Sequence, residues 1–327
     1  MRLLLAAAAA LNLLAAHPDA KTEWWYYTGH LQSAGGREFG FELTFFRAKL
    51  ADGQDVDAAH FAVTDVSRRK FSFEEKLHRP FPGIADADAS KLFVYNEGWE
   101  TREEAGKHVL RAGGGENAIE LTLTPLKAPI RNGSAGISRK GPGPDDYSNY
   151  VSIPRLAAQG ALTADGKKES VAGIAWFDHE FGPGGLPKGL AGWDWFSLQL
   201  SDGTELMLYR LRLQDGSVSE FSSGTFVAAD GSATHLPKSA FEARATGRWT
   251  SPRTRATYPA GWAVKVPSRG LDVTVTPRVA DQELVTAKST RVTYWEGACD
   301  VAGASGGRPV TGKSYVELTG YAGKDLP

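Results

Sequence analysis

Apolar and polar residues alternate with a period of two along most of this chain, and that alternation constrains its fold more than any other feature. In the stretch 38–46, every second residue from Phe39 to Phe45 is apolar. The same pattern recurs in the stretches 117–124, 205–213 and 271–276. Successive side chains of a β-strand point to opposite faces, so each stretch is predicted to be a half-buried strand.

Turn signals separate the predicted strands. Asp52-Gly53, Asp215-Gly216 and Asp230-Gly231 are dipeptides typical of β-hairpins. Glycine accounts for 37 of the 327 residues, a share of about 11% against a usual share of about 7%. Hardly any stretch shows a helical period. The sequence therefore predicts an all-β fold of antiparallel sheets in sandwiches or barrels.

The chain carries a weak internal echo. Trp24-Trp25-Tyr26-Tyr27 opens an aromatic hairpin in the first half, and Trp193-Asp194-Trp195-Phe196 opens another in the second half. A Gly/Pro-rich break over 181–189 precedes the second hairpin. We predict two β-barrel-like domains, residues 17–185 and 186–327, with the long Gly/Pro loop 129–146 as a lid of the first.

The N-terminus resembles a secretion signal. Arg2 precedes an apolar stretch over 3–14, which has the length of a signal h-region and is too short to span a bilayer. We predict a signal peptide over 1–16, a secreted or periplasmic location and no stable membrane span. The lone Cys299 rules out a disulfide within the chain.

The net charge and the spacing of the histidines argue against several classes of ligand. The 37 Lys and Arg residues nearly balance the 38 Asp and Glu residues, which argues against a nucleic-acid partner. The seven histidines show no metal-ligand spacing, and no phosphate-binding glycine loop is present. We expect neither a metal site nor a cofactor.

One acidic cluster is a candidate for catalysis. Asp178, His179 and Glu180 lie between Trp176-Phe177 and Phe181, where partial desolvation would raise the pKa of a carboxyl group and favour proton transfer. On a strand, Asp178 and Glu180 share one face and His179 takes the other. The alternative is a strand end whose charges face solvent or close the gap between the domains.

Aromatic residues form the second candidate site. A set of large rings with few polar groups is a suitable lining for a long apolar ligand. The alternative is that each ring fills a barrel core. The predicted ligand-binding residues are Trp24, Trp25, Tyr27, Trp176, Trp193, Trp195, Tyr209 and Trp295.

The stretch from His17 to Gly29 resembles the opening signature of the family that contains carotenoid 1,2-hydratase (hydroxyneurosporene synthase) and the secreted AttH-like proteins. The segments 175–182, 192–196, 294–297 and 316–321 agree with the family pattern, so the resemblance spans 17–321. It implies two lipocalin-like (calycin-type) barrels packed together and an apolar, often isoprenoid or polyketide-like, ligand. Some relatives add water to a carbon–carbon double bond, and others act as pericyclic cyclases.

Two departures indicate the AttH-like branch. The carotenoid hydratases carry His-x-Trp where this chain has His179-Glu180-Phe181, and Tyr-x-Asp where it has Tyr209-Arg210-Leu211. Two hypotheses stay open. One is a hydratase-like lyase with Asp178, His179 or Glu180 as proton donor. The other is a non-catalytic carrier that hands a lipid to components of an ABC export system, which the resemblance implies because some relatives are found beside such systems. Some relatives are also labelled predicted hydrolases, so the resemblance also implies a secreted hydrolase as an alternative.

Overall fold

The computed structural model describes residues 13–50, 52–184 and 187–323. Its long elements are all β-strands, and the helical segments among the described residues are two 3-10 turns, η1 (Lys238–Ala240) and η2 (Pro267–Arg269). The predicted strands at 38–46, 117–124, 205–213 and 271–276 are all present. The all-β prediction is confirmed. No helix of the described residues has the length and apolarity needed to cross a bilayer.

The first sheet contains thirteen strands and runs in the order β4-β3-β2-β1-β13-β12-β9-β8-β7-β6-β5, with β10 and β11 also paired to β12. Its strands are β1 (Thr22–Ser33), β2 (Glu38–Lys49), β3 (Asp55–Asp65), β4 (Lys70–His78), β5 (Ala85–Ala87), β6 (Phe93–Asn96), β7 (Trp99–Glu104), β8 (Lys107–Gly114), β9 (Asn117–Pro125), β10 (Ile130–Arg131), β11 (Ile137–Arg139), β12 (Tyr147–Ala164) and β13 (Lys167–Gly182).

The second sheet contains ten strands in the order β17-β16-β15-β14-β25-β24-β22-β21-β18, with β23 also paired to β24. Its strands are β14 (Leu190–Leu200), β15 (Glu205–Leu213), β16 (Ser223–Val227), β17 (Ala233–Pro237), β18 (Glu242–Ala245), β21 (Trp262–Val266), β22 (Leu271–Pro277), β23 (Glu283–Val285), β24 (Thr293–Ser305) and β25 (Arg308–Leu318). A separate hairpin joins β19 (Arg248–Thr250) to β20 (Thr257–Pro259).

The two sheets share one topology. In each, the first strand lies between the second and the last: β1 between β2 and β13, and β14 between β15 and β25. The aromatic echo of the sequence marks these two equivalent positions. Each sheet curls into an antiparallel barrel of lipocalin type around its own apolar core. In the first barrel the two ends of the sheet approach each other: β6 contacts β3 and β4, and Asn96 Nδ2 of β6 donates to the Asp57 carbonyl of β3 at 3.0 Å.

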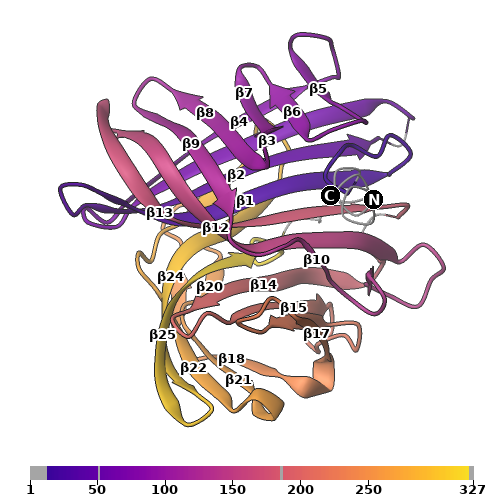
Figure 1. Cartoon of the computed structure of the whole chain (residues 1–327). Coiled ribbons are helices and arrows are strands. Elements are labelled where there is room, and N and C mark those ends of the chain that lie inside the picture. Colours follow the sequence, from indigo (N-terminus) through magenta and orange to yellow (C-terminus); the bar gives the residue numbers. More distant parts are fainter. Residues whose placement is uncertain (1–12, 51, 185–186, 324–327) are drawn as a thin grey trace, which may run out of the picture.

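The barrels pack side by side through the outer faces of a few strands, and Figure 1 shows them one above the other. β1 contacts β25, β2 contacts β24, and β12 contacts β14. The approach is close at Gly40, where a Cβ atom would lie 2.7 Å from Ala298 Cβ and 2.8 Å from the Tyr315 hydroxyl. Only a residue without a side chain fits there without displacing its neighbours.

The predicted loop 129–146 contains β10 and β11, which pair with β12. β13, the last strand of the first sheet, ends at Gly182, and β14, the first strand of the second sheet, begins at Leu190. The chain therefore passes from one sheet to the other within the predicted Gly/Pro break. The division of the chain into domains at 185/186 remains a prediction.

Residues 1–12 of the predicted signal peptide lie outside the described residues, whereas residues 13–16 pack against the first barrel. Leu14 and Ala16 belong to its apolar core. Trp25 Nε1 donates to the Leu14 carbonyl at 2.9 Å, and the Ala16 amide donates to the Asp88 carbonyl at 2.9 Å. This short segment therefore covers one part of the barrel interior.

Candidate functional site

Strand β13 carries the acidic cluster, and its alternation sends the three side chains to two different places. Asp178 and Glu180 face the second sheet, together with Trp176. His179 points to the other side, into the first barrel, where it stacks on Trp25 with ring centroids 4.8 Å apart. The structure therefore confirms that Asp178 and Glu180 share one face of the strand and that His179 takes the other.

Asp178 is buried and accepts hydrogen bonds from three side chains. Tyr150 donates its hydroxyl to Oδ2 at 2.6 Å, while Ser152 at 2.5 Å and Trp176 Nε1 at 2.7 Å donate to Oδ1. Burial raises the pKa of Asp178 to about 7, against the opposing effect of these donors. Near neutral pH the group can therefore both give and take a proton, as a general acid–base catalyst must.

Glu180 lies beside Asp178 and has its own partners. Lys140 Nζ is 2.9 Å from Glu180 Oε1, and the Ser148 hydroxyl also donates to that atom. Burial opposes the charge on Lys140, but Glu180, Tyr209 and Asp178 together outweigh it and raise the lysine pKa. Lys140 follows β11, so the loop expected to act as a lid supplies the cation of this site.

Aromatic side chains from both sheets surround these carboxyl groups. Trp195 Nε1 donates to the Tyr150 hydroxyl at 2.8 Å, and the Trp195 and Trp176 rings meet edge to face, with centroids 6.3 Å apart. Tyr209 accepts or donates a 2.8 Å hydrogen bond with Ser138 of β11 and lies under Lys140 Nζ, 4.0 Å from its ring centroid. We call this set, which also includes the partly buried Trp24 and Trp193, the interbarrel aromatic cluster.

The eight predicted ligand-binding residues fall into separate groups. Trp24, Trp176, Trp193, Trp195 and Tyr209 meet in the interbarrel aromatic cluster. Trp25 and Tyr27 lie inside the first barrel, and Trp295 lies inside the second. These last three are buried among core residues, so the structure does not bring them to the site that holds the other five.

A pocket of about 320 Å³ adjoins the cluster and is lined by residues that include Lys140, Leu190 and Phe221. Leu190 and Phe221 pack against the aromatic cluster, and Lys140 bonds to Glu180. Lys140 thus lies between the pocket and the buried carboxyl groups. A second pocket of about 390 Å³ lies against Asp194, Arg210 and Arg212 of the second sheet.

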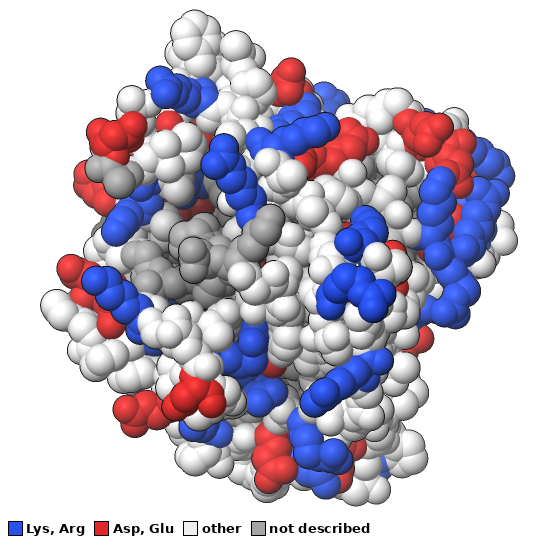
Figure 2. Space-filling model, turned by 180° about the vertical axis from the view of Figure 1, so that it is seen from behind, with Lys and Arg blue, Asp and Glu red and all other residues white. Residues whose placement is uncertain are grey.

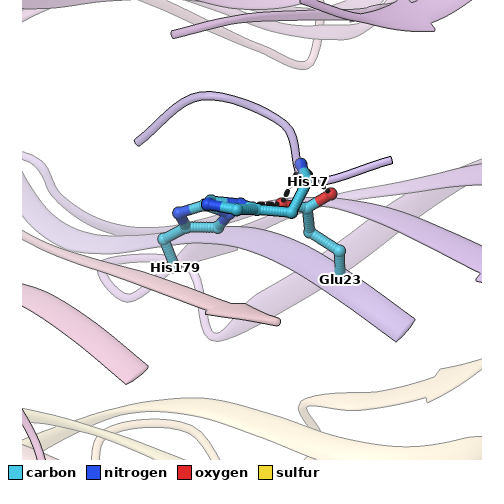
Figure 3. A group of neighbouring side chains, drawn as sticks. All are labelled: His17, Glu23 and His179. Atoms are coloured by element: carbon cyan, nitrogen blue, oxygen red, sulfur yellow. Dashed lines mark hydrogen bonds and ion pairs between the residues drawn. The ribbon is translucent and has the colours of Figure 1, made fainter. Parts of the chain in front are cut away.

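A third group of side chains gathers at the other face of β13. His17 Nδ1 and His179 Nε2 each lie 2.9 Å from Glu23 Oε1, and Figure 3 shows the three side chains converging. The His17 amide also donates to both Glu23 oxygens, at 3.0 and 3.1 Å. Although burial opposes it, hydrogen bonding from the two histidines lowers the pKa of Glu23, which is therefore ionised.

The hydrogen atoms of His179 follow from its partners. Nδ1 lies 2.7 Å from the Leu13 carbonyl, which can only accept, so Nδ1 carries a hydrogen. Nε2 lies 2.9 Å from the carboxylate oxygen of Glu23. The two ring nitrogens of His179 therefore link the Leu13 carbonyl to the buried Glu23 carboxylate.

Comparison with known proteins identifies the family. The profile of the AttH-like family matches residues 12–321. The chain belongs to the AttH-like family. No curated protein sequence matches it significantly.

Solved structures agree with the AttH-like assignment. A putative AttH from Nitrosomonas europaea is 32% identical, with a TM-score of 0.87 over 95% of this chain and 96% of that one. Kievitone hydratase from Nectria haematococca is 18% identical, with a TM-score of 0.77 over 94% of this chain and 92% of that one. The second likeness shows that the AttH-like protein shares its fold with a hydratase.

Sequence reasoning missed several residues of these sites in the AttH-like chain. Tyr150 and Lys140 bond to the acidic cluster, and Glu23 joins the two histidines. Glu23 stands at the start of a strongly aromatic strand, which is an unusual place for a charge. That position was the one available signal for a buried partner.

Proposed function

We propose that this AttH-like protein binds an elongated apolar molecule at the interbarrel aromatic cluster and adds water to one of its carbon–carbon double bonds. The observation that carries the proposal is Asp178, a carboxyl group with a pKa of about 7 held between Trp176 and Tyr150. The 320 Å³ pocket at Lys140 is the entrance in this proposal.

The reaction uses Asp178 twice. Its protonated carboxyl group transfers the proton to one alkene carbon, which leaves a carbocation on the other. Water attacks the cation, and the resulting oxonium ion returns a proton to the Asp178 carboxylate, so the net change is the addition of one water. The π-faces of Trp176 and Trp195 stabilise the developing positive charge.

The fold supports this chemistry without specifying the substrate. The structurally similar protein from Nectria haematococca is a kievitone hydratase, so the double-barrel fold can host a hydratase. In this chain Leu211 stands where the carotenoid hydratases have an acid, and Leu211 lies in the interbarrel aromatic cluster. We propose that Asp178, from the other barrel, supplies the proton in its place.

The test is turnover of a panel of linear isoprenoid alkenes, with products detected by mass spectrometry as the gain of one water. Asp178→Asn should lower turnover by about 10²-fold or more, because a general acid is lost while the side-chain shape is kept. Asp272→Asn, which changes an exposed carboxylate on β22, serves as the matched control and should leave turnover unchanged. Equal turnover of the wild type and Asp178→Asn would refute the role of Asp178.

A lipid carrier is the second candidate function. Asp178 accepts three hydrogen bonds, which are enough to stabilise a buried carboxyl group that has no catalytic role. Quenching of tryptophan fluorescence by the same isoprenoids, with no product formed by any of them, would favour the carrier. In that case Asp178→Asn should bind the ligand as well as the wild type does.

A further inference from the structure

We propose that His17, Glu23 and His179 form a binding site for a divalent transition-metal ion of the zinc class. The site is separate from the interbarrel aromatic cluster, since it lies on the opposite face of β13. The inference is independent of the proposed hydration. It also departs from the expectation of no metal site, which rested on the absence of metal-ligand spacing among the histidines.

The donor atoms already converge. One imidazole nitrogen from each histidine and a Glu23 oxygen all lie within 4.8 Å of one another. Two imidazoles with one carboxylate form a ligand set used by catalytic zinc sites, which keep a fourth position for water. Nitrogen donors of this kind favour zinc, cobalt, nickel or copper over magnesium or calcium, which prefer oxygen ligands.

The two rings are held in place. His179 donates its Nδ1 hydrogen to the Leu13 carbonyl, which turns Nε2 toward Glu23. A backbone carbonyl on the second ring nitrogen is the usual support of a metal-ligating histidine. The His17 ring stacks on Phe181 with centroids 3.4 Å apart and planes 7° apart, which fixes Nδ1 toward the same carboxylate.

The site is buried on one side and open on the other. His179 and Glu23 are buried, whereas the His17 side chain is 29% exposed. An ion can therefore enter past His17 and bind between the two imidazoles and Glu23, and any proton on a coordinating nitrogen is released to solvent. The pairing of β1 with β13 sets Glu23 opposite Phe181, so the two strands that carry Glu23 and His179 are hydrogen-bonded neighbours.

The experiment uses the full chain, purified without a polyhistidine tag and stripped with a chelator. Cobalt(II) is the probe, because its visible absorption reports a four-coordinate site with nitrogen ligands. We expect one equivalent of cobalt to bind, zinc to displace it, and native mass spectrometry to find one zinc ion per chain. Zinc should also raise the melting temperature, since a ligand that binds only the folded state stabilises it.

Variants locate the site. His17→Ala and Glu23→Gln should each weaken cobalt binding by at least about 100-fold, more than the loss of a residue that merely supports a ligand. His17→Ala is the key variant because His17 is partly exposed and its loss spares the core. His78→Ala is the matched control, since His78 pairs with Glu97 on the surface at 3.2 Å, and it should bind cobalt normally.

Two outcomes would overturn the proposal. One is the absence of cobalt and zinc binding by the folded wild-type chain at micromolar metal concentrations. The other is metal binding that His17→Ala, Glu23→Gln and His179→Gln leave unchanged. If these variants lower the melting temperature but the wild type binds no metal, the three residues act only as a structural latch for residues 13–17.

Discussion

Glu42 and Asp178 are buried carboxyl groups between the two barrels, and Glu317 is a half-buried one. Burial raises the pKa of Glu42 to about 8 and those of Asp178 and Glu317 to about 7. The folded protein therefore keeps protons that the unfolded chain releases near pH 4. Such groups lower stability as the pH rises from their unfolded to their folded pKa.

Burial also raises the pKa of Glu296 well above its usual value, so we expect the free energy of unfolding to fall by at least about 3 kcal/mol between pH 6.5 and 8.5, measured by urea titration. Above pH 6.5 the buried histidines His30, His60 and His108 do not interfere, because burial lowers the pKa of His30 and His60 to about 3 and that of His108 to about 4. Glu42→Gln, which cannot ionise, should make the fall smaller than in the wild type. A flat profile in the wild type would contradict the burial of these carboxyl groups.

At the residue scale, the face of the strand on which each side chain lies was predictable from the sequence, but the side chains that it contacts were not. Asp178 and Glu180 face one way and His179 the other because β13 is extended. The same parity separates Trp24 from Trp25 and Tyr27, and could have sorted the predicted aromatic set. Glu23 could not be paired with His179 in advance, because the register of β1 on β13 joins segments about 150 residues apart.

At the scale of strands, β2 and β24 meet where Gly40 faces Ala298 and Tyr315. Gly40→Ala should lower the free energy of unfolding by about 1–3 kcal/mol, because the added methyl group has no room between the barrels. Gly114→Ala is the control, since a Cβ there meets nothing within 4 Å. Equal stability of the two variants in urea would mean that the barrels can move apart at no cost.

Strand identity was predictable because alternation and Asp-Gly turns are local signals. The echo between β1 and β14 was visible for the same reason. The role of the loop 129–146 was only partly visible. Its Gly and Pro residues marked a break, but the pairing of its short strand β11 with β12 places Ser138 at Tyr209 and Lys140, the next residue after β11, at Glu180.

At the scale of the whole molecule, the barrels are joined by buried polar contacts as well as by aromatic packing. Tyr26 donates to Glu296 at 2.7 Å, Thr64 donates to Gln282 at 2.8 Å, and Arg155 and Lys127 both pair with Glu205. Each contact joins the first barrel, or a loop next to it, to the second. On the face in Figure 2 charges of both signs are interspersed, in keeping with the near-zero net charge.

We therefore expect the two barrels to unfold together. Separating them would expose the apolar surface of the interbarrel aromatic cluster to water, at about 25 cal/mol per Å². Thermal unfolding followed by tryptophan fluorescence and by far-UV circular dichroism should give one coincident transition. Two well-separated transitions would show that each barrel is stable without the other.

The packing of residues 13–16 in the first barrel restricts when a peptidase could cut the chain after Ala16. The bond after Ala16, where the sequence predicts cleavage, follows a residue that is 5% exposed and whose amide is bonded to Asp88. A peptidase needs an extended and accessible segment, so such a cut must precede the closing of the first barrel. A cut chain would then fold with neither the Leu13 carbonyl at His179 nor the Leu14 carbonyl at Trp25. If the predicted cleavage occurs, the order of cleavage and folding decides which of two barrel interiors is formed.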